Sequence, residues 1–217
     1  MTDPAHLAAH LAAVRESYDT VAADYVRLVV PPEGMDPVSR AMLAAFAELV
    51  RASGGGEVAD LGCGPGRVTA YLYGLGLSAF GVDVSGEMVA LARRAYPELR
   101  FRQGTMTALD LPDGALGGIL AWYSVHHTPP ELLPALFAEF HRALAPGGHL
   151  LLGGHIGDAR LHPATGYGHP VSYTSHLVPA DRLVDLLAGA GFTVTTRLEQ
   201  PCPGHPERGY VSLLAHG

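Results

Sequence analysis

The stretch that decides the fold is Glu57-Val58-Ala59-Asp60-Leu61-Gly62-Cys63-Gly64-Pro65-Gly66-Arg67-Val68. It begins with an apolar strand pattern, passes through three closely spaced glycines, and enters a helical pattern from Val68 to Leu75. A strand, a glycine turn and a helix in this order form the nucleotide-type binding crevice of an open α/β sheet. The glycines allow a tight turn and let the backbone approach a ligand without a Cβ in the way.

Two features separate this turn from a dinucleotide-binding turn. The dinucleotide pattern G-x-G-x-x-G places a helix N-terminus against a pyrophosphate. Here the spacing is Gly62-x-Gly64-x-Gly66, and Arg67 stands where the third glycine is expected. The strand also ends in a carboxylate, Asp60, which repels a phosphate and suits an ammonium group. The stretch resembles motif I, D-x-G-x-G-x-G, of the class I S-adenosylmethionine (SAM) dependent methyltransferases.

A second carboxylate follows the next apolar strand, Ser78–Val82. This residue, Asp83, comes 21 positions after Gly62, the offset at which an acid binds ribose hydroxyls in nucleotide-binding α/β units. Ser85 is a suitable N-cap for the helix that follows. The resemblance implies that this is motif II, with Asp83 on the ribose and Met88 against the adenine. The alternatives are a solvated acid at a helix start and a methionine that only fills the core.

Two further patterns resemble the same family. Leu144-Ala145-Pro146-Gly147-Gly148 precedes an apolar strand, as in another family hallmark. Tyr18-Asp19-x-x-Ala22-x-x-Tyr25 resembles the N-terminal pattern that often covers the SAM pocket, although a core-facing stripe at helical spacing is the simpler interpretation. The resemblance covers roughly residues 18–152.

The chain departs from the family pattern at two positions. Thr105 follows Gly104 where the family usually has an aspartate that accepts from the adenine amino group. A threonine hydroxyl still accepts a hydrogen bond, but without charge assistance. Gly118 lies where many relatives carry an aspartate. The cofactor-binding residues that the resemblance implies are Tyr18, Tyr25, Asp60, Gly62, Cys63, Gly64, Gly66, Arg67, Asp83, Val84, Met88, Gly104, Thr105, Met106, Ala121 and Trp122.

The catalytic candidates follow the fourth predicted strand, because ligands in open α/β sheets sit at the carboxyl ends of strands. Methyl transfer from a sulfonium needs mainly alignment, and it needs a base only if the acceptor loses a proton as it attacks. Histidine suits that role near neutral pH. We prefer His127, with His126 and Tyr123 as the other candidates. The alternative is that His127 only holds the loop at the strand end.

Residues 155–178 contain several glycines and prolines, which argue against a long helix. By position they resemble the family's variable insertion, which often lines the substrate pocket, so we expect the acceptor to contact Tyr167, His169, Tyr173 and His176. Histidines recur every seven residues here, but that spacing has no meaning outside a helix. Because there is no H-x-x-x-H, cysteine partner or acidic cluster, we predict no metal site.

Composition favours one domain, since 217 residues suffice to bury a sizeable core. We divide the chain into a helical cap (1–53), a SAM-binding core (57–154), the insertion (155–178), and a closing helix and hairpin (179–217). The net charge of -7 argues against nucleic-acid binding, and no apolar run reaches membrane-span length. Residues 1–10 lack a signal-peptide pattern, and two cysteines do not make a disulfide framework. We therefore expect a cytoplasmic monomer or homodimer without membrane partners.

The predicted fold is α/β, the Rossmann-like class I methyltransferase fold, with helices on both faces of a seven-stranded, mostly parallel sheet. The resemblance implies that the last strand is antiparallel and that an N-terminal helical lid covers the site. The predicted function is methyl transfer from SAM to a small-molecule acceptor. One alternative is a SAM-binding protein of the same fold that transfers no methyl group. A second is a nicotinamide-dependent oxidoreductase, against which Asp60, Arg67 and the lack of a Tyr-x-x-x-Lys pair all count.

Overall fold

The structure is a computed structural model in which residues 4–217 are described. The start of the 1–10 segment, on which the prediction of no signal peptide rests, lies outside these residues. Seven strands form the central sheet, in the order β10-β11-β5-β4-β1-β2-β3. Their bounds are β1 Glu57–Leu61, β2 Ser78–Asp83, β3 Arg100–Gln103, β4 Leu116–Trp122, β5 Leu144–Gly157, β10 Thr193–Pro201 and β11 Arg208–His216.

Strands β1 to β5 are parallel to one another, and β11 is antiparallel to both of its neighbours. The predicted sheet with an antiparallel last strand is therefore confirmed. The predicted C-terminal hairpin also forms. Of the two hairpin strands, however, only β10 lies at an edge of the sheet, because β11 is inserted between β10 and β5.

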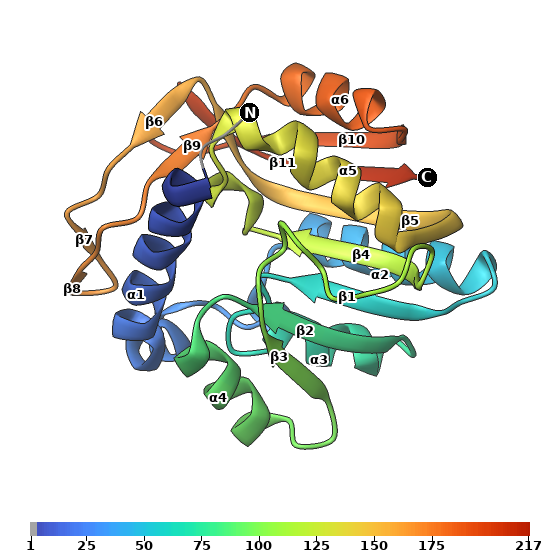
Figure 1. The fold of residues 1–217 in the computed structure, drawn as a ribbon, viewed down its shortest axis with the longest axis horizontal. Coiled ribbons are helices and arrows are strands. Elements are labelled where there is room, and N and C mark those ends of the chain that lie inside the picture. The colour runs from blue at the N-terminus through green and yellow to red at the C-terminus, as the bar shows by residue number, and fades with distance from the viewer. Residues whose placement is uncertain (1–3) are drawn as a thin grey trace.

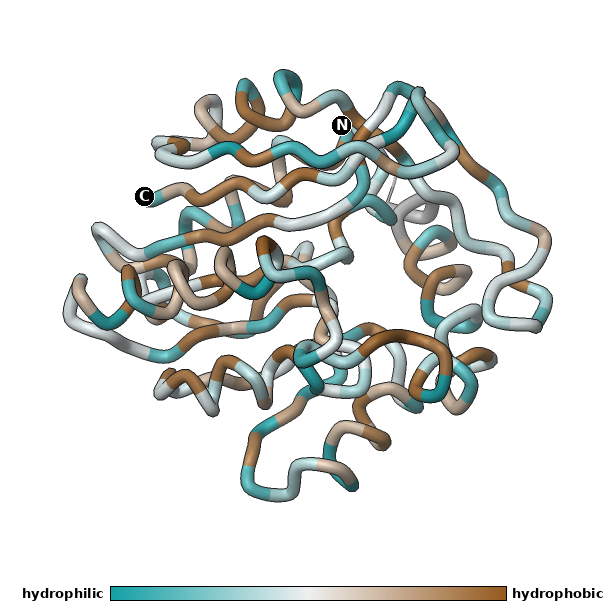
Figure 2. Tube along the Cα trace, turned by 180° about the vertical axis from the view of Figure 1, so that it is seen from behind, coloured by the Kyte–Doolittle hydropathy of each residue, from teal (hydrophilic) through white to brown (hydrophobic). Residues whose placement is uncertain are grey.

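Helices cover both faces of the sheet (Figure 1). Helices α2 and α3 pack on one face and α5 and α6 on the other, while α4 packs against β3 near the far edge. The hydrophobic residues run along the central strands and the inner sides of the helices (Figure 2). The helix bounds are α1 Pro4–Leu28, α2 Pro37–Ala52, α3 Arg67–Gly74, α4 Gly86–Ala95, α5 Leu133–Ala143 and α6 Ala180–Gly189.

Local sequence explains where several elements begin. Asp36 accepts hydrogen bonds from the amides of Val38 and Ser39 at the start of α2, and Pro37 occupies the first helical position. Ser85 accepts from the amide of Met88, so the predicted N-cap of α4 is confirmed. Three short 3-10 helices complete the helical elements of the described chain: η1 Pro32–Gly34, η2 Val125–His127 and η3 Pro130–Leu132.

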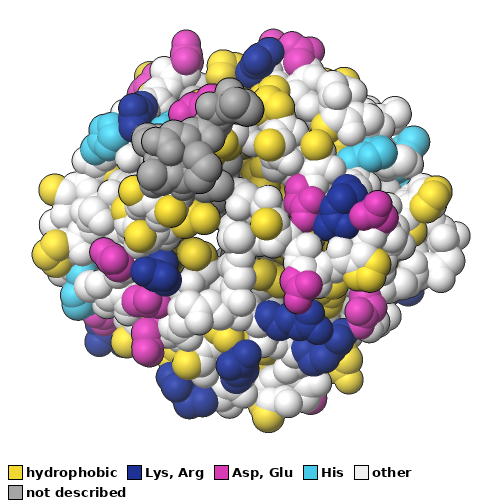
Figure 3. All heavy atoms as spheres, in the orientation of Figure 1, with side chains coloured by type: hydrophobic (Ala, Val, Ile, Leu, Met, Phe, Trp, Pro, Cys, Tyr) yellow, Lys and Arg dark blue, Asp and Glu magenta, His cyan; other side chains and the backbone are white. Residues whose placement is uncertain are grey.

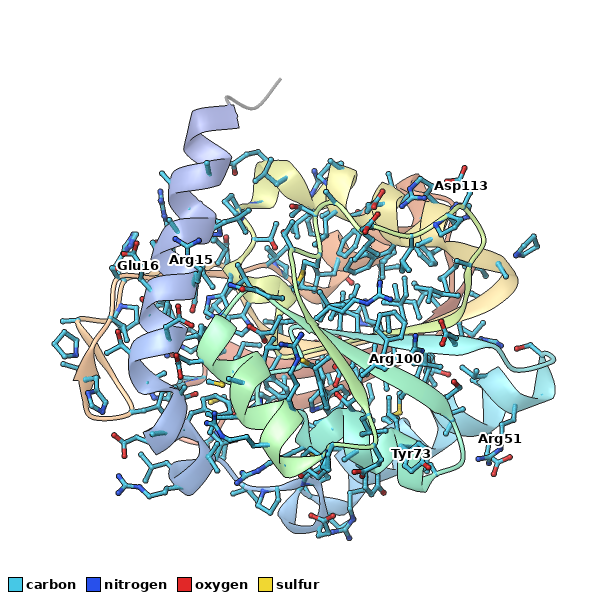
Figure 4. The ribbon with its side chains drawn as sticks, turned by 60° about the horizontal axis from the view of Figure 1, so that its bottom comes forward. Arg15, Glu16, Arg51, Tyr73, Arg100 and Asp113 are labelled. Carbon is cyan, nitrogen blue, oxygen red and sulfur yellow. The ribbon has the colours of Figure 1, made fainter. Side chains whose placement is uncertain are left out.

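Helix α1 and the insertion lie beyond the carboxyl ends of the parallel strands (Figure 1). Arg15 and Glu16 lie on the exposed outer side of α1, away from the sheet (Figure 4). The insertion forms two small antiparallel pairs rather than a helix. These strands are β6 Ala159–Leu161, β7 Thr165–Gly166, β8 His169–Pro170 and β9 Ser175–Leu177. Among residues 4–217 no helix is long and apolar enough to span a membrane.

Basic side chains gather over α4 and β3 (Figure 3). Two of these arginines serve the protein's own structure. Arg93 donates to the carbonyl of Phe101, and Arg100 forms an ion pair with Glu57. Local structural contacts therefore account for part of this basic surface.

Candidate functional site

Two adjoining cavities lie at the carboxyl ends of the parallel strands. The inner cavity extends between α1, the end of β2 and the start of α4. The outer cavity, with a volume of about 470 Å³, extends from the glycine turn to the insertion and the start of β11. A volume of this size is typical of small-molecule sites. The two cavities share a wall formed by Tyr18, Tyr25, Gly62, Gly64, Trp122 and Tyr123.

Asp83 lies at the end of β2 and lines the inner cavity. One carboxylate oxygen accepts from the amide of Gly64 at 2.8 Å, and the other accepts from the amide of Ser85 at 2.9 Å. A carboxylate has about four acceptor sites, so both oxygens retain capacity for a ligand hydroxyl. Burial raises the pKa of Asp83, and the two amides oppose that effect. The remaining cofactor candidates in this cavity are Val84, Met88, Gly104, Thr105 and Met106.

Asp60 lies at the end of β1, lines the outer cavity and is only 1% exposed. Its carboxylate accepts from the hydroxyl of Thr69 at 2.6 Å. Burial raises the pKa of Asp60 to about 7. A buried carboxylate with one neutral donor has little to stabilise its charge, so a cationic ligand group suits this position.

The three glycines of the turn have different roles. Gly62 and Gly64 both adopt positive φ and line both cavities. A Cβ on Gly62 would lie 2.3 Å from the Cβ of Ser124, whereas one on Gly64 would point into open space. Gly66 is the N-cap of α3 and packs against Phe101, outside both cavities. Cys63 is buried and lines only the outer cavity.

Two polar contacts hold α1 over the site. The guanidinium of Arg67 donates to the carbonyls of Val29 at 2.6 Å and Val26 at 2.5 Å. These carbonyls lie at and just beyond the C-terminal end of α1, where a cation is favourable. Asp19 accepts from the hydroxyl of Ser85 at 2.6 Å, and also from an amide at the start of α4. Arg67 in the glycine turn and Asp19 in the lid pattern therefore both attach α1 to the cofactor-binding core.

Tyr18 and His127 form a hydrogen-bonded pair. The hydroxyl of Tyr18 lies 2.9 Å from Nε2 of His127, and Nδ1 of His127 lies 3.3 Å from the carbonyl of Thr174. Because a carbonyl only accepts, Nδ1 carries the proton and Nε2 accepts from Tyr18. Burial lowers the pKa of His127 to about 4 and raises the pKa of Tyr18. Both side chains are therefore neutral near pH 7.

The other catalytic candidates lie on the outer side of this pair. Tyr123 has a φ of 54°, which is unusual for a residue with a side chain and is a form of strain found at functional sites. Its ring lies 5.1 Å from that of His155. His126 lines the outer cavity, with its ring 4.2 Å from that of His127. Burial lowers the pKa of His126.

The two departures from the family pattern have local explanations. Thr105 lines the inner cavity, but its hydroxyl oxygen accepts from the amide of Thr107 at 3.2 Å. A Cβ on Gly118 would lie 2.9 Å from both Phe46 and Val50, so α2 leaves no room for an aspartate there. Ala121, a predicted cofactor contact, is fully buried in the core and lines neither cavity.

Of the four substrate contacts predicted in the insertion, two line the outer cavity and two do not. Tyr167 and Tyr173 line the outer cavity, and Tyr173 stacks on Tyr18 with ring centroids 5.7 Å apart. His169 lies 2.5 Å from Asp24 on α1, and His176 is buried beside a separate groove; neither lines the two cavities. No group of three or more potential metal ligands occurs in the part of the chain that the structure describes.

Sequence reasoning missed several residues of the outer cavity, among them two with polar side chains on neighbouring strands. Arg208, at the start of β11, and His155, near the end of β5, lie on paired strands and both line this cavity. They are far apart in sequence and belong to no motif. Only the register of β11 against β5 brings them together.

Comparisons with known proteins agree with this geometry. A sequence model of the methyltransferase domain family matches residues 58–148. An uncharacterized methyltransferase of Mycobacterium tuberculosis is 29% identical over 168 residues, which cover 64% of this chain and 66% of the relative. The match thus spans slightly less than two thirds of that relative.

Two solved structures share the fold. A Burkholderia thailandensis 1,6-didemethyltoxoflavin-N1-methyltransferase, solved with S-adenosylhomocysteine, has a TM-score of 0.68 and 24% identity, and covers 100% of this chain and 91% of its own. The cyclase SpnF has a TM-score of 0.71 and 18% identity, and covers 94% of this chain and 95% of its own. With the glycine turn, the two strand-end acids and the sheet order, these matches show that the chain has the fold of the class I SAM-dependent methyltransferases and resembles that family over residues 58–148.

Proposed function

We propose that this protein transfers a methyl group from SAM to a small-molecule acceptor. The observation that carries the proposal is the shared wall between the two cavities. Residues typical of an adenosine site line the inner cavity, and an aromatic pocket of about 470 Å³ forms the outer one. A donor held across the glycine turn therefore faces an acceptor directly, without a tunnel or a second domain.

The residues present fit SAM. Asp60 is a buried acid that lacks a cationic partner within the described chain, and it suits the amino group of the methionine part. Asp83 retains acceptor capacity for the ribose hydroxyls. Met88 offers an apolar surface for the adenine. The open space beside Gly64 lets the ligand pass close to the backbone.

The chain's own contribution to the reaction is alignment and the exclusion of water. SAM supplies a methyl group that is already activated on a sulfonium. Tyr18 and Tyr25 from the lid and Trp122 from β4 surround the junction of the cavities with aromatic rings. Holding two reactants in line in such an enclosure removes most of the entropic barrier to a displacement.

The pair of Tyr18 and His127 favours a positioning role for the histidine. Its basic nitrogen already accepts from Tyr18, and a pKa of about 4 makes it a weak base near neutral pH. We therefore propose that His127 orients the Tyr18 hydroxyl toward the junction, and that the acceptor needs no strong base. The base role predicted for His127, His126 or Tyr123 stays a prediction.

A second candidate function is SAM binding without methyl transfer. The observation that favours it is the same lack of a free base, because neither His126 nor His127 is poised to take a proton near pH 7. Likeness to the cyclase SpnF shows that a chain with this fold can carry another activity.

Calorimetric titration with SAM, S-adenosylhomocysteine and NAD tests the cofactor. We expect micromolar binding of the two adenosyl ligands and none of NAD. Transfer of a labelled methyl group to a panel of small acceptors then separates the two candidate functions. Adenosyl binding without transfer to any acceptor would favour the second candidate, and lack of adenosyl binding would contradict both.

A cytoplasmic location, as a monomer or homodimer without nucleic-acid or membrane partners, belongs to the same proposal. The acidic net charge and the two free cysteines support it.

A further inference from the structure

Three buried side-chain nitrogens within the described residues lack a hydrogen-bond partner: Trp122 Nε1, His126 Nδ1 and Arg208 Nε. All three residues line the outer cavity. Buried polar atoms are nearly always paired, so three unpaired ones around a single cavity indicate a ligand that supplies the partners. The indole and guanidinium nitrogens only donate, and the ligand must therefore present acceptor atoms.

Trp122 provides the unpaired donor nearest the cofactor. Its side chain is 8% exposed and lines both cavities. The Cε3–Cζ3 edge of the indole packs against Gly153 on β5, where an added Cβ would lie 2.4 Å away. Because Nε1 lies on the opposite edge of the ring, it is turned away from β5.

Arg208 provides the positive charge at the other end of the cavity. Its side chain is 32% exposed, and its Nε lies 3.3 Å from Glu207 without hydrogen-bond geometry. Glu207 is 57% exposed, so this ion pair is weak and a ligand anion can compete with it. The charge of Arg208 reaches His155, whose pKa burial and this guanidinium lower together.

A continuous aromatic wall connects the two donors. Ring centroids are separated by 5.6 Å from Trp122 to Tyr123, 5.1 Å from Tyr123 to His155 and 5.4 Å from His155 to His126. Tyr167 also lines this cavity. These rings meet edge to face, and a flat, unsaturated molecule suits the cavity because it can make further edge-to-face or offset-stacked contacts with them.

The acids of the outer cavity do not require a cationic acceptor. Asp36 accepts from two amides at the start of α2, and hydrogen bonds from the Ser39 side chain, these amides and Gln200 lower its pKa. Asp60 lies at the cofactor end and suits the cofactor's amino group. Arg67 is engaged with the lid carbonyls. Arg208 is therefore the cation in this cavity that is most available to a ligand.

From this arrangement we infer that the acceptor is a planar molecule bearing a carboxylate, which Arg208 binds while the ring lies along the wall from His155 to Trp122. Arg208 is then the residue that determines acceptor specificity. The inference rests on the proposed function for the identity of the ligand as an acceptor. The anion site itself does not depend on methyl transfer.

The test uses protein saturated with S-adenosylhomocysteine and three probes of similar size: 4-hydroxybenzoate, 4-hydroxybenzamide and 4-hydroxybenzylamine. Calorimetry measures the affinity of each probe. We expect 4-hydroxybenzoate to bind at least about tenfold more tightly than the other two, on the scale of one charge-assisted hydrogen-bond pair. Arg208→Gln should remove this preference, and Arg208→Lys should restore part of it.

Arg182→Gln is the matched control, since it removes one exposed positive charge on α6, away from both cavities. It should leave the preference unchanged. A carboxylate preference that survives in a folded Arg208→Gln protein would overturn the inference. Tighter binding of the amine would overturn it too and would point to Asp36. Failure of all three probes to bind would equally count against it.

The cofactor titration separates this inference from the proposed function. Binding of 4-hydroxybenzoate with an Arg208-dependent preference, in a protein that fails to bind S-adenosylhomocysteine, would keep the anion site and remove the methyltransferase proposal. For that comparison the probes are also titrated without cofactor. Normal cofactor binding with no carboxylate preference would remove the anion site and leave the methyltransferase proposal standing.

Discussion

Replacing Asp60 by asparagine should separate stability from cofactor binding. The carboxyl has a pKa of about 7 in the folded chain and an ordinary value of 3.8. The folded protein therefore keeps a proton that the unfolded chain releases, and stability falls as the pH rises from about 4 through about 7. The difference between the two pKa values corresponds to about 4 kcal/mol of lost stability above pH 7.

The asparagine of the Asp60→Asn variant keeps an acceptor for Thr69 and cannot ionise. We expect the stability of this variant, relative to the unchanged protein, to rise by about 2–3 kcal/mol between pH 5 and pH 8. Urea unfolding of cofactor-free protein at the two pH values measures this. Asp185→Asn on the exposed side of α6 is the control and should show no such change.

The same substitution should weaken SAM binding by roughly tenfold or more, because the amino group loses a charged partner. Saturating SAM should also reduce the pH dependence of the unchanged protein, since the ligand's positive charge favours the ionised carboxylate. Equal slopes of stability against pH for Asp60→Asn and the unchanged protein would refute the reasoning. So would SAM affinity that does not change.

Four further single substitutions test other parts of the site. Asp83→Ala should weaken SAM binding by roughly 1–3 kcal/mol in calorimetry, because a buried acceptor is lost; unchanged affinity would exclude a ribose role. Tyr18→Phe and His127→Ala should each lower turnover, and the double variant should be no slower than the worse single one, because the two side chains act as one pair. A loss of roughly a hundredfold or more in His127→Ala alone, with Tyr18→Phe fully active, would instead identify the histidine as a base. Gly118→Asp, which installs the family residue, should destabilise the fold by about 3 kcal/mol or more in thermal unfolding, because its Cβ meets Phe46 and Val50; an unchanged melting temperature would show that α2 adapts.

Short-range pattern predicted most of the fold. Helix α2, for example, begins after Asp36 at Pro37 and ends before the glycines that follow Ser53, so local sequence accounts for both of its limits. The site residues around Asp60 and Asp83 could also be predicted from the sequence, because a strand end and the turn after it are local features. Their placement at one edge of the sheet needs only parallel strands.

The outer cavity was harder to predict from the sequence, for a physical reason. His155 and Arg208 meet through the pairing of β11 with β5, which joins residues about fifty positions apart. No local periodicity records that register. The structure of the insertion could not be predicted from the sequence either. Its short strands are held by contacts with α1, such as that between His169 and Asp24. The family pattern also implied a cofactor contact for Ala121, whereas strand alternation turns this side chain into the core.

The position of β11 between β10 and β5 has a consequence for folding. Nine residue pairs join β11 to β5, so β10 has no place in the sheet until β11 has docked. The parallel strands β1 to β5 supply the cofactor turn and both acids from residues synthesised earlier. Arg208 and its pairing partner Gly157 come together only when β11 pairs with β5. A chain whose β11 has not yet paired can thus form the cofactor half of its site before the proposed acceptor half, and bound SAM would stabilise that intermediate.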